Sequence, residues 1–318
     1  MTAPLRLGLV GQNIHHSLSP LLQQKALELS GLQGEYALFD CQNPPEFLEV
    51  LARLRRHELD GLNVTTPFKP LALQHADGWL RLGQHRAGVL TLPANTLFMQ
   101  ENRLIATSTD GPGLAAALLS AQVDLTGKTL LLLGAGGAGQ AIAGDLLALG
   151  LQNLLVTNRS ALPELFARLA KIWPDRVRVQ PWGQARGLAQ VDVVVHATRA
   201  GHGQAANAQT QAGIAEDFAW LPWKSWRKQQ PLLVDLVYAP DLTPWQGYAQ
   251  EQGLQVDARL QEIPLTTPQL YPELQEPRGI LAHAGQAMLA HQAARSFEVW
   301  TGQRVDGRQL LQALLQKP

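Results

Sequence analysis

Apolar runs alternate with helix-like repeats along the N-terminal part of the chain. LRLGLV (5–10) is almost continuously apolar, as expected of a buried strand. A second strand is expected at EYALFD (35–40), and PPEFLEVLARLRR (44–56) has the spacing of a helix with proline at its start. LDGLNVT (59–65) predicts a third strand. With a helix also expected after Ser19-Pro20, this β-α-β-α-β order predicts an α/β fold with a mostly parallel sheet.

A hairpin is expected next, within NTLFMQENRLIATSTD (95–110). Its two apolar arms would turn at Glu101-Asn102, and Asp110 would end the second arm. The small, polar segment 201–213, further along the chain, predicts a mobile surface loop.

A new unit begins near residue 125. Residues 127–160 give strand, glycine turn, helix and strand, and further strands are expected at VDVVVHAT (191–198) and PLLVDLVYA (231–239). The last helices, at 285–302 and 306–317, are separated from that sheet by a Pro-rich segment. We therefore expect two domains, one from residues 1–113 with 285–318 and the other from residues 114–284.

Charge and composition exclude several classes of partner. Lys+Arg and Asp+Glu both total 26 in 318 residues, which gives no electrostatic case for binding nucleic acid or an anionic membrane. The apolar stretch 129–149 holds five glycines and Asp145, so it is not expected to span a membrane. One cysteine, Cys41, cannot form an internal disulfide, and the N-terminus lacks the pattern of a signal peptide. A cytoplasmic protein is expected. The histidines show no metal-ligand spacing, so no metal is expected.

The glycine turn predicts a dinucleotide site. Gly134, Gly136 and Gly139 form G-x-G-x-x-G directly after an apolar strand and at the start of a helix. The first glycine permits the turn, the second lets the backbone approach a pyrophosphate, and the third lets helix pack on strand. A tight structural turn without ligand is the alternative. The predicted cofactor-binding residues are Gly134, Ala135, Gly136, Gly137, Ala138, Gly139, Asn158, Arg159, Ser160 and Thr198.

The end of the second strand of this unit favours NADP over NAD. That strand ends at Asn158-Arg159-Ser160, where an NAD site usually carries an acidic residue. Arg159 could pair bidentately with a 2′-phosphate, and no carboxylate in this stretch would repel it. NAD stays an alternative, as does a surface role for Arg159.

Eight segments together resemble the shikimate dehydrogenase family, in the family's order and over nearly the whole chain. They are HSLSP (16–20), NVTTPFK (63–69), ANTL (94–97), STDGPG (108–113), GAGGAG (134–139), TNRS (157–160), VDLVYAPDLTPW (234–245) and MLAHQAARSFEVWTG (288–302). The resemblance implies reversible NADPH-dependent reduction of 3-dehydroshikimate to shikimate, a cyclitol carboxylate. It also implies that residues 1–113 and 285–318 bind substrate, that residues 114–284 form a Rossmann-type NAD(P) domain, and that the active site lies between them.

The resemblance also implies roles for individual residues. Lys69 and Asp110 would be the catalytic pair, with the ammonium of Lys69 donating a proton as the carbonyl becomes an alkoxide. The implied substrate-binding residues are Ser17, Ser19, Asn63, Thr65, Asn95, Tyr238 and Gln292. Structural alternatives remain: Ser19 and Asp110 could each cap a helix, and Lys69 could be a solvated loop residue. Phe68 and Pro70 on either side would restrict the ammonium of Lys69.

Several positions depart from the family pattern and suggest a divergent member. Pro163 stands near the place of a second phosphate-binding arginine, which Arg199 could replace. His196 stands where the family usually has asparagine. Leu92-Pro93 and Ala287 replace small residues, and 258–284 is longer than usual.

These departures leave other functions open. Quinate or an aminoshikimate could be the substrate, with NAD as an alternative cofactor. A catalytically silent NADP-binding regulatory protein is a further alternative. The sequence does not specify the oligomeric state, and a homodimer stays open.

Overall fold

The computed structural model describes residues 3–82, 93–201, 207–262 and 276–316. These residues form two compact units. The first contains the described parts of 1–84, 89–114 and 289–318, and the second the described parts of 115–288. The chain passes from the first to the second within helix α4 and returns within α11.

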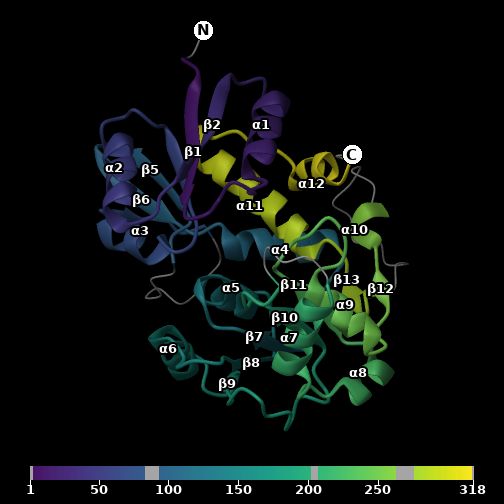
Figure 1. Ribbon diagram of the computed structural model, residues 1–318. Helices are drawn as coiled ribbons and strands as arrows, with labels where there is room; N and C mark the ends of the chain where they lie inside the picture. Colours follow the sequence, from purple (N-terminus) through teal and green to yellow (C-terminus); the bar gives the residue numbers. More distant parts are fainter. Residues whose placement is uncertain (1–2, 83–92, 202–206, 263–275, 317–318) are drawn as a thin grey trace. The chain divides into compact units, whose positions relative to one another are not determined.

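The first unit is built on a mixed sheet with the order β2-β1-β3-β5-β6-β4. Strand β1 is parallel to β2 and β3, whereas β5 is antiparallel to both β3 and β6. In Figure 1, helices α2 and α3 lie on one side of these strands and α1, α11 and α12 on the other. The elements are β1 (Leu5–Gly11), α1 (Ser19–Ser30), β2 (Gly34–Asp40), α2 (Pro44–Arg55), β3 (Gly61–Val64), α3 (Lys69–His75), β4 (Gly78–Trp79), β5 (Thr96–Gln100), β6 (Arg103–Thr107), α4 (Asp110–Ser120), α11 (Ala284–Thr301) and α12 (Gly307–Leu315).

Local sequence explains several of these boundaries. Asn43 caps α2 by accepting a hydrogen bond from the Glu46 N–H at 3.0 Å, and Pro44 begins the helix. The predicted hairpin turn is confirmed, since Glu101 and Asn102 both have positive φ, 51° and 58°. A core that includes Phe47, Leu54, Leu62, Leu97 and Leu104 fills the space between the sheet and the helices beside it.

The second unit is built on an all-parallel sheet with the order β12-β13-β11-β10-β7-β8-β9. Strand order reverses between β7 and β10, and in such sheets ligands bind at the carboxyl ends of the strands at this point. The buried core of the second unit includes Leu131, Phe218, Trp226, Leu233 and Trp245. The elements are β7 (Thr129–Leu133), α5 (Gly137–Ala148), β8 (Asn153–Thr157), α6 (Glu164–Ile172), β9 (Val177–Val179), β10 (Val193–His196), α7 (Ala208–Phe218), α8 (Trp223–Gln229), β11 (Leu232–Asp235), α9 (Pro244–Glu251), β12 (Val256–Asp257), α10 (Arg259–Glu262) and β13 (Ile280–Leu281).

The prediction of a surface loop at 201–213 is wrong for residues 208–213. Helix α7 begins at Ala208, and Asn207 caps it by accepting from the Thr210 N–H at 2.9 Å. Because this stretch has few apolar residues, its pattern did not indicate a helix, and Asn207 was not recognised as a cap. Residues 202–206 of that expectation lie outside the described residues. Among the described residues, no helix combines the length and apolarity needed to cross a membrane.

Acid should destabilise the first unit through His291 in α11. Burial lowers the pKa of His291 from 6.5 to about 4; the nearby Asp306 opposes this shift and Arg308 adds to it. Because the unfolded chain takes up this proton at higher pH than the folded chain, stability is present above pH 6.5 and is lost towards pH 4. We expect a loss of roughly 2 kcal/mol between pH 7.5 and pH 5 from this group.

Urea unfolding at the two pH values measures this loss. His291→Gln should flatten the dependence, whereas His75→Gln, which changes an exposed histidine at the end of α3, should leave it unchanged. An equal pH dependence in wild type and His291→Gln would contradict the assignment.

Candidate active site

Lys69 and Asp110 form an ion pair in the first unit. Lys69 is the first residue of α3, and the ring of the preceding Phe68 stacks on Phe47 at 5.0 Å, which fixes the start of the helix. The Nζ of Lys69 donates to Oδ2 of Asp110 at 2.5 Å, and the side chains of Lys69 and Asp110 are 15% and 4% exposed. Asp110 does not end the hairpin as expected; β6 stops at Thr107, and Asp110 is the first residue of α4. The expected pairing of these two charges is present.

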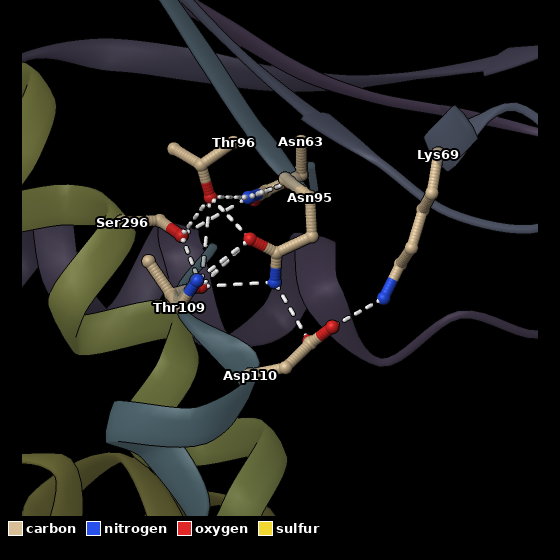
Figure 2. Close-up of polar contacts among 7 residues, drawn as sticks. All are labelled: Asn63, Lys69, Asn95, Thr96, Thr109, Asp110 and Ser296. Atoms are coloured by element: carbon tan, nitrogen blue, oxygen red, sulfur yellow. Dashed lines mark hydrogen bonds and ion pairs between the residues drawn. The ribbon is translucent and has the colours of Figure 1, made fainter. Parts of the chain in front are cut away.

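Asn95 holds the carboxylate of Asp110 from the other side (Figure 2). Its Nδ2 donates to Oδ1 of Asp110 at 2.7 Å, and its Oδ1 accepts from the backbone N–H of Thr109 at 2.8 Å. Because Oδ1 must face that N–H, the amide can turn only its NH₂ group towards Asp110. Each oxygen of the carboxylate thus has a donor, one charged and one neutral.

A buried polar network supports Asn95. Asn63 Nδ2 lies within hydrogen-bonding distance of the Asn95 carbonyl, Thr96 Oγ1 and Ser296 Oγ, at 3.1, 3.1 and 3.0 Å. Thr96 and Ser296 are 2.9 Å apart. The network joins β3, β5 and α11, as Figure 2 shows. It fixes the strand end that carries Asn95.

Tyr36 on β2 extends this network. Its hydroxyl donates to Oδ1 of Asn63 at 2.8 Å. Burial raises the pKa of the Tyr36 hydroxyl, with hydrogen bonding to Ser19 as a smaller opposing cause. The phenol is therefore neutral and acts as a donor at physiological pH.

Four other residues predicted for the substrate lie on loops and helices of the same unit, whereas Tyr238 belongs to the second unit. Ser17 Oγ accepts from the Ser19 N–H at 3.2 Å in the loop before α1. The capping role considered for Ser19 is wrong, because Leu18 is the N-cap and Ser19 begins the helix. Thr65 directly follows β3. Gln292 Oε1 is buried without a hydrogen-bond partner among the described residues, which fits an acceptor for a ligand hydroxyl.

The glycine turn of the second unit has the geometry expected of a phosphate cradle. Gly134 has φ 105°, and a Cβ there would lie 2.9 Å from the backbone of Ala197 and Thr198 after β10. A Cβ on Gly139 would lie 2.3 Å from the Gly134 carbonyl oxygen. Apart from the adjacent residues of the chain, no described atom lies within 4 Å of a Cβ built on Gly136, so this side of the turn is open to a ligand. The residues present therefore fit a dinucleotide pyrophosphate at the start of α5.

Asn158 ties the glycine turn to the end of β8. Its Oδ1 accepts from the Ala135 N–H at 3.1 Å, and its Nδ2 donates to Ser160 Oγ at 3.0 Å. Arg159 next to it is not free, since its guanidinium pairs with both oxygens of Asp217 at 2.8 and 2.9 Å. The arginine assigned to a 2′-phosphate therefore already has an anionic partner.

His196 belongs to a buried hydrogen-bonded chain that ends at Thr198. Its Nδ1 lies 2.8 Å from Oδ1 of Asp235, and its Nε2 lies 2.6 Å from Thr198 Oγ1. Asp235 also accepts from the Val237 N–H at 2.9 Å and from the Thr243 hydroxyl. The side chains of His196 and Asp235 are fully buried, and the His196 ring stacks on Trp245 at 4.8 Å. These hydrogen bonds fix the position of Thr198 beside Gly134.

Replacing His196 with alanine should therefore cost stability. The variant leaves a buried carboxylate with one partner fewer and opens a cavity beside Trp245, so we expect a loss of about 3–5 kcal/mol in the free energy of unfolding. Denaturant unfolding measures it. Thr198→Val, which removes only the hydroxyl, should cost about 1 kcal/mol. A loss below about 1 kcal/mol for His196→Ala would show that Asp235 is satisfied without it.

The remaining positions singled out in the sequence lie in the second unit or outside the described residues. Tyr238 follows β11, and burial raises the pKa of its hydroxyl. Ala287 is fully buried in α11. Arg199 is exposed beside Thr198, and its phosphate contact stays a prediction. Leu92 and residues 263–275 of the segment 258–284 lie outside the described residues.

Sequence reasoning missed four members of the polar network, Tyr36, Thr96, Thr109 and Ser296. Three of them stand inside segments that carried the resemblance, ANTL, STDGPG and MLAHQAARSFEVWTG, so the signal was present but was assigned to their neighbours. Tyr36 stands in an ordinary strand pattern, and only its partner Asn63 distinguishes it.

Three family profiles match the chain in succession. "Shikimate dehydrogenase substrate binding domain" matches residues 9–85, "Shikimate / quinate 5-dehydrogenase" residues 114–244, and "Shikimate 5'-dehydrogenase C-terminal domain" residues 287–315.

Individual relatives match over nearly their full length. A shikimate dehydrogenase (NADP(+)) of Thermus thermophilus is 33% identical over 94% of this chain and 93% of its own, and that of an Exiguobacterium species is 28% identical over 98% and 100%. The crystal structure of a Thermus thermophilus shikimate 5-dehydrogenase, in complex with NADP(H) and shikimate, superposes with a TM-score of 0.70 at 30% identity, covering 97% of this chain and 98% of that one. Identity at this level over whole chains means that this chain belongs to the shikimate dehydrogenase family.

Proposed function

We propose that this chain catalyses the reversible NADPH-dependent reduction of the 3-keto group of 3-dehydroshikimate to shikimate. The observation that carries the proposal is the Lys69–Asp110 pair, which is nearly buried and held by Asn95. An ammonium group in such a position suits a reaction in which a carbonyl oxygen gains negative charge.

The first unit would bind the substrate. A polyhydroxylated carboxylate needs many short hydrogen-bonding groups, and the polar residues around Lys69 supply them. Ser17 and Ser19 would bind the carboxylate, with Asn63, Thr65 and Asn95 near the ring hydroxyls. The unpartnered Oε1 of Gln292 would accept a hydrogen bond from a hydroxyl of the substrate.

Lys69 would manage the proton of the reaction. When bound, the nicotinamide cofactor supplies the hydride that reduces the carbonyl carbon. The Lys69 ammonium stabilises the charge that develops on the carbonyl oxygen and donates a proton to it, which completes the alcohol. Asp110 orients the ammonium and balances its charge, while Asn95 keeps Asp110 in place.

The second unit would hold the cofactor. The N–H groups at the start of α5 and the open side of Gly136 support binding of the pyrophosphate. Thr198, fixed by His196, would contact the cofactor beside the turn, with Tyr238 near the nicotinamide. Arg159 would recognise the adenosine ribose or its 2′-phosphate.

Location and partners form the rest of the proposal. A cytoplasmic location agrees with the single, buried cysteine. The balanced charge supports a small-molecule partner without nucleic acid. A homodimer remains an open alternative.

An assay panel tests the proposed reaction. The purified chain would be mixed with NADP or NAD and, in turn, shikimate, quinate or an amino analogue, and formation of the reduced cofactor followed by absorbance. Turnover of shikimate with NADP is expected. Preference for quinate or an amino analogue would move the substrate assignment within the family. Cofactor binding without turnover of any substrate would instead indicate a regulatory protein.

A further inference from the structure

The contact between Arg159 and Asp217 is not explained by the proposed reaction. Asp217 lies in the last turn of α7, where the helix dipole disfavours a carboxylate. The guanidinium of Arg159 compensates by pairing with both carboxylate oxygens. Asp217 thus does not stabilise its helix through the dipole. It occupies the arginine that the proposed function assigns to the adenosine ribose.

The surroundings of Arg159 hold this contact in one place. Its Cζ lies 5.9 Å from the centroid of the Trp182 ring, and Trp182 packs edge-on against Phe218 and Trp220 at 5.4 and 5.3 Å. The indole N–H of Trp220 donates to the Asp217 carbonyl oxygen at 2.9 Å. An aromatic cluster thus anchors the end of α7 under the guanidinium. The pair is part of a packed arrangement and not an isolated surface contact.

Both oxygens of Asp217 are bound by Nη1 of Arg159, so a 2′-phosphate would have to use the other N–H groups of the same guanidinium or displace Asp217 from Nη1. In the first case the carboxylate lies close to a second anion, and in both cases the two anions compete for one positive charge. A ribose with a free 2′-hydroxyl makes no such demand, because a carboxylate can accept from that hydroxyl, as the acidic residue of NAD sites does.

We propose that Asp217 is a specificity-determining residue. It weakens the binding of a 2′-phosphate by Arg159 and so reduces the preference for NADP over NAD. The proposal rests on the proposed dinucleotide site of the second unit. The effect has an upper limit, because Arg159 and Asp217 are 53% and 28% exposed and water screens their attraction.

The test is binding to the full-length chain, measured by calorimetry without substrate. The probes are NADP+ and NAD+, together with the fragments 2′,5′-ADP and 5′-AMP, which differ only in the 2′-phosphate. Asp217→Asn should lower the Kd of NADP+ and 2′,5′-ADP roughly tenfold, since both the competition and the repulsion are removed. The Kd of NAD+ and 5′-AMP should stay within about twofold or rise.

Matched variants separate the contact from general charge. Glu216→Gln removes the same charge from the neighbouring exposed residue of α7 and should leave all four Kd values within about twofold. Asp217→Ser provides a second variant with the same expectation as Asp217→Asn. In an Arg159→Gln background, Asp217→Asn should lower the Kd of NADP+ by a clearly smaller factor than in wild type, because only the repulsion between carboxylate and phosphate is then removed.

Two results would overturn the proposal in different ways. If wild type binds the dinucleotides but Asp217→Asn changes the Kd of NADP+ by less than twofold, or tightens NAD+ equally, the role of Asp217 is wrong and the proposed function stands. If neither dinucleotide nor fragment binds the wild type, the proposed function and this inference both fail.

Discussion

Lys69→Ala should lower kcat by roughly 10²–10⁴-fold in either direction, the range that a positioned acid–base group contributes. The variant removes both the proton donor and the positive charge that stabilises the developing alkoxide. KM for the substrate should change much less, because the hydroxyl and carboxylate partners remain. Steady-state kinetics with shikimate and NADP measure both constants.

The fold should survive this substitution. Lys69 is the first residue of a short helix, and Phe68, not Lys69, packs in the core. The Kd of NADP+ should therefore stay close to wild type, whereas the thermal unfolding midpoint should fall because the nearly buried Asp110 loses its charged partner. Lys25→Ala, which removes an exposed lysine of α1 paired with Glu28, is the matched control and should leave kcat unchanged. A kcat within tenfold of wild type for Lys69→Ala would remove Lys69 from the chemistry.

Asp110→Asn should lower kcat by about 10²–10³-fold. The new side chain has the same shape and can still accept from Asn95, but it presents an NH₂ group or a neutral oxygen to Lys69 in place of a carboxylate. The ammonium then lacks the partner that orients it and offsets its charge in a nearly buried position. The same kinetics measure the loss, and Asp60→Asn, which changes an exposed partner of Arg6, is the control.

The double variant distinguishes a catalytic pair from two separate contributions. If Asp110 acts by holding Lys69, then Asp110→Asn should add little once Lys69 is alanine, since residues that act as a unit are not additive. Losses that multiply in the double variant would mean that Asp110 acts on the substrate independently of Lys69. Full activity of folded Asp110→Asn would contradict both roles.

The Asn63–Asn95–Ser296 network explains how this pair is kept in register. The polar side chains of the network have hydrogen-bond partners within it, and most of its members are buried. Because a buried polar group without a partner is costly, each side chain restricts the orientation of the next. The precision of the site therefore comes from β3, β5 and α11 together.

Features that depend on near neighbours in the chain could be predicted from the sequence. The glycine turn at 134–139, the hairpin turn at Glu101-Asn102 and the order of strands and helices are of this kind. Each is set by the φ preferences, hydrophobic period or capping of adjacent residues. The catalytic roles expected of Lys69 and Asp110 have a different basis, since they rest on short motifs in a fixed order, and they stay a prediction.

Local reasoning failed where a polar residue had more than one plausible role. Ser19 and Asp110 both precede helical patterns, and the sequence offered capping as a role for each. The structure makes Leu18 the cap of α1 and gives the Asp110 carboxylate to Lys69 and Asn95. Segment 208–213 was too polar to look like a helix, although α7 begins there.

The sequence by itself determined the alternation of elements and the glycine turn, because adjacent residues encode these, and short motifs in a fixed order singled out Lys69 and Asp110. Only the tertiary structure decided which groups meet. Lys69 and Asp110 are 41 positions apart, Arg159 and Asp217 are 58 apart, and Asn63 and Ser296 are 233 apart. A hydrogen bond requires its two atoms to lie about 3 Å apart, and across such separations only the register of the strands and the packing of the helices fix that distance.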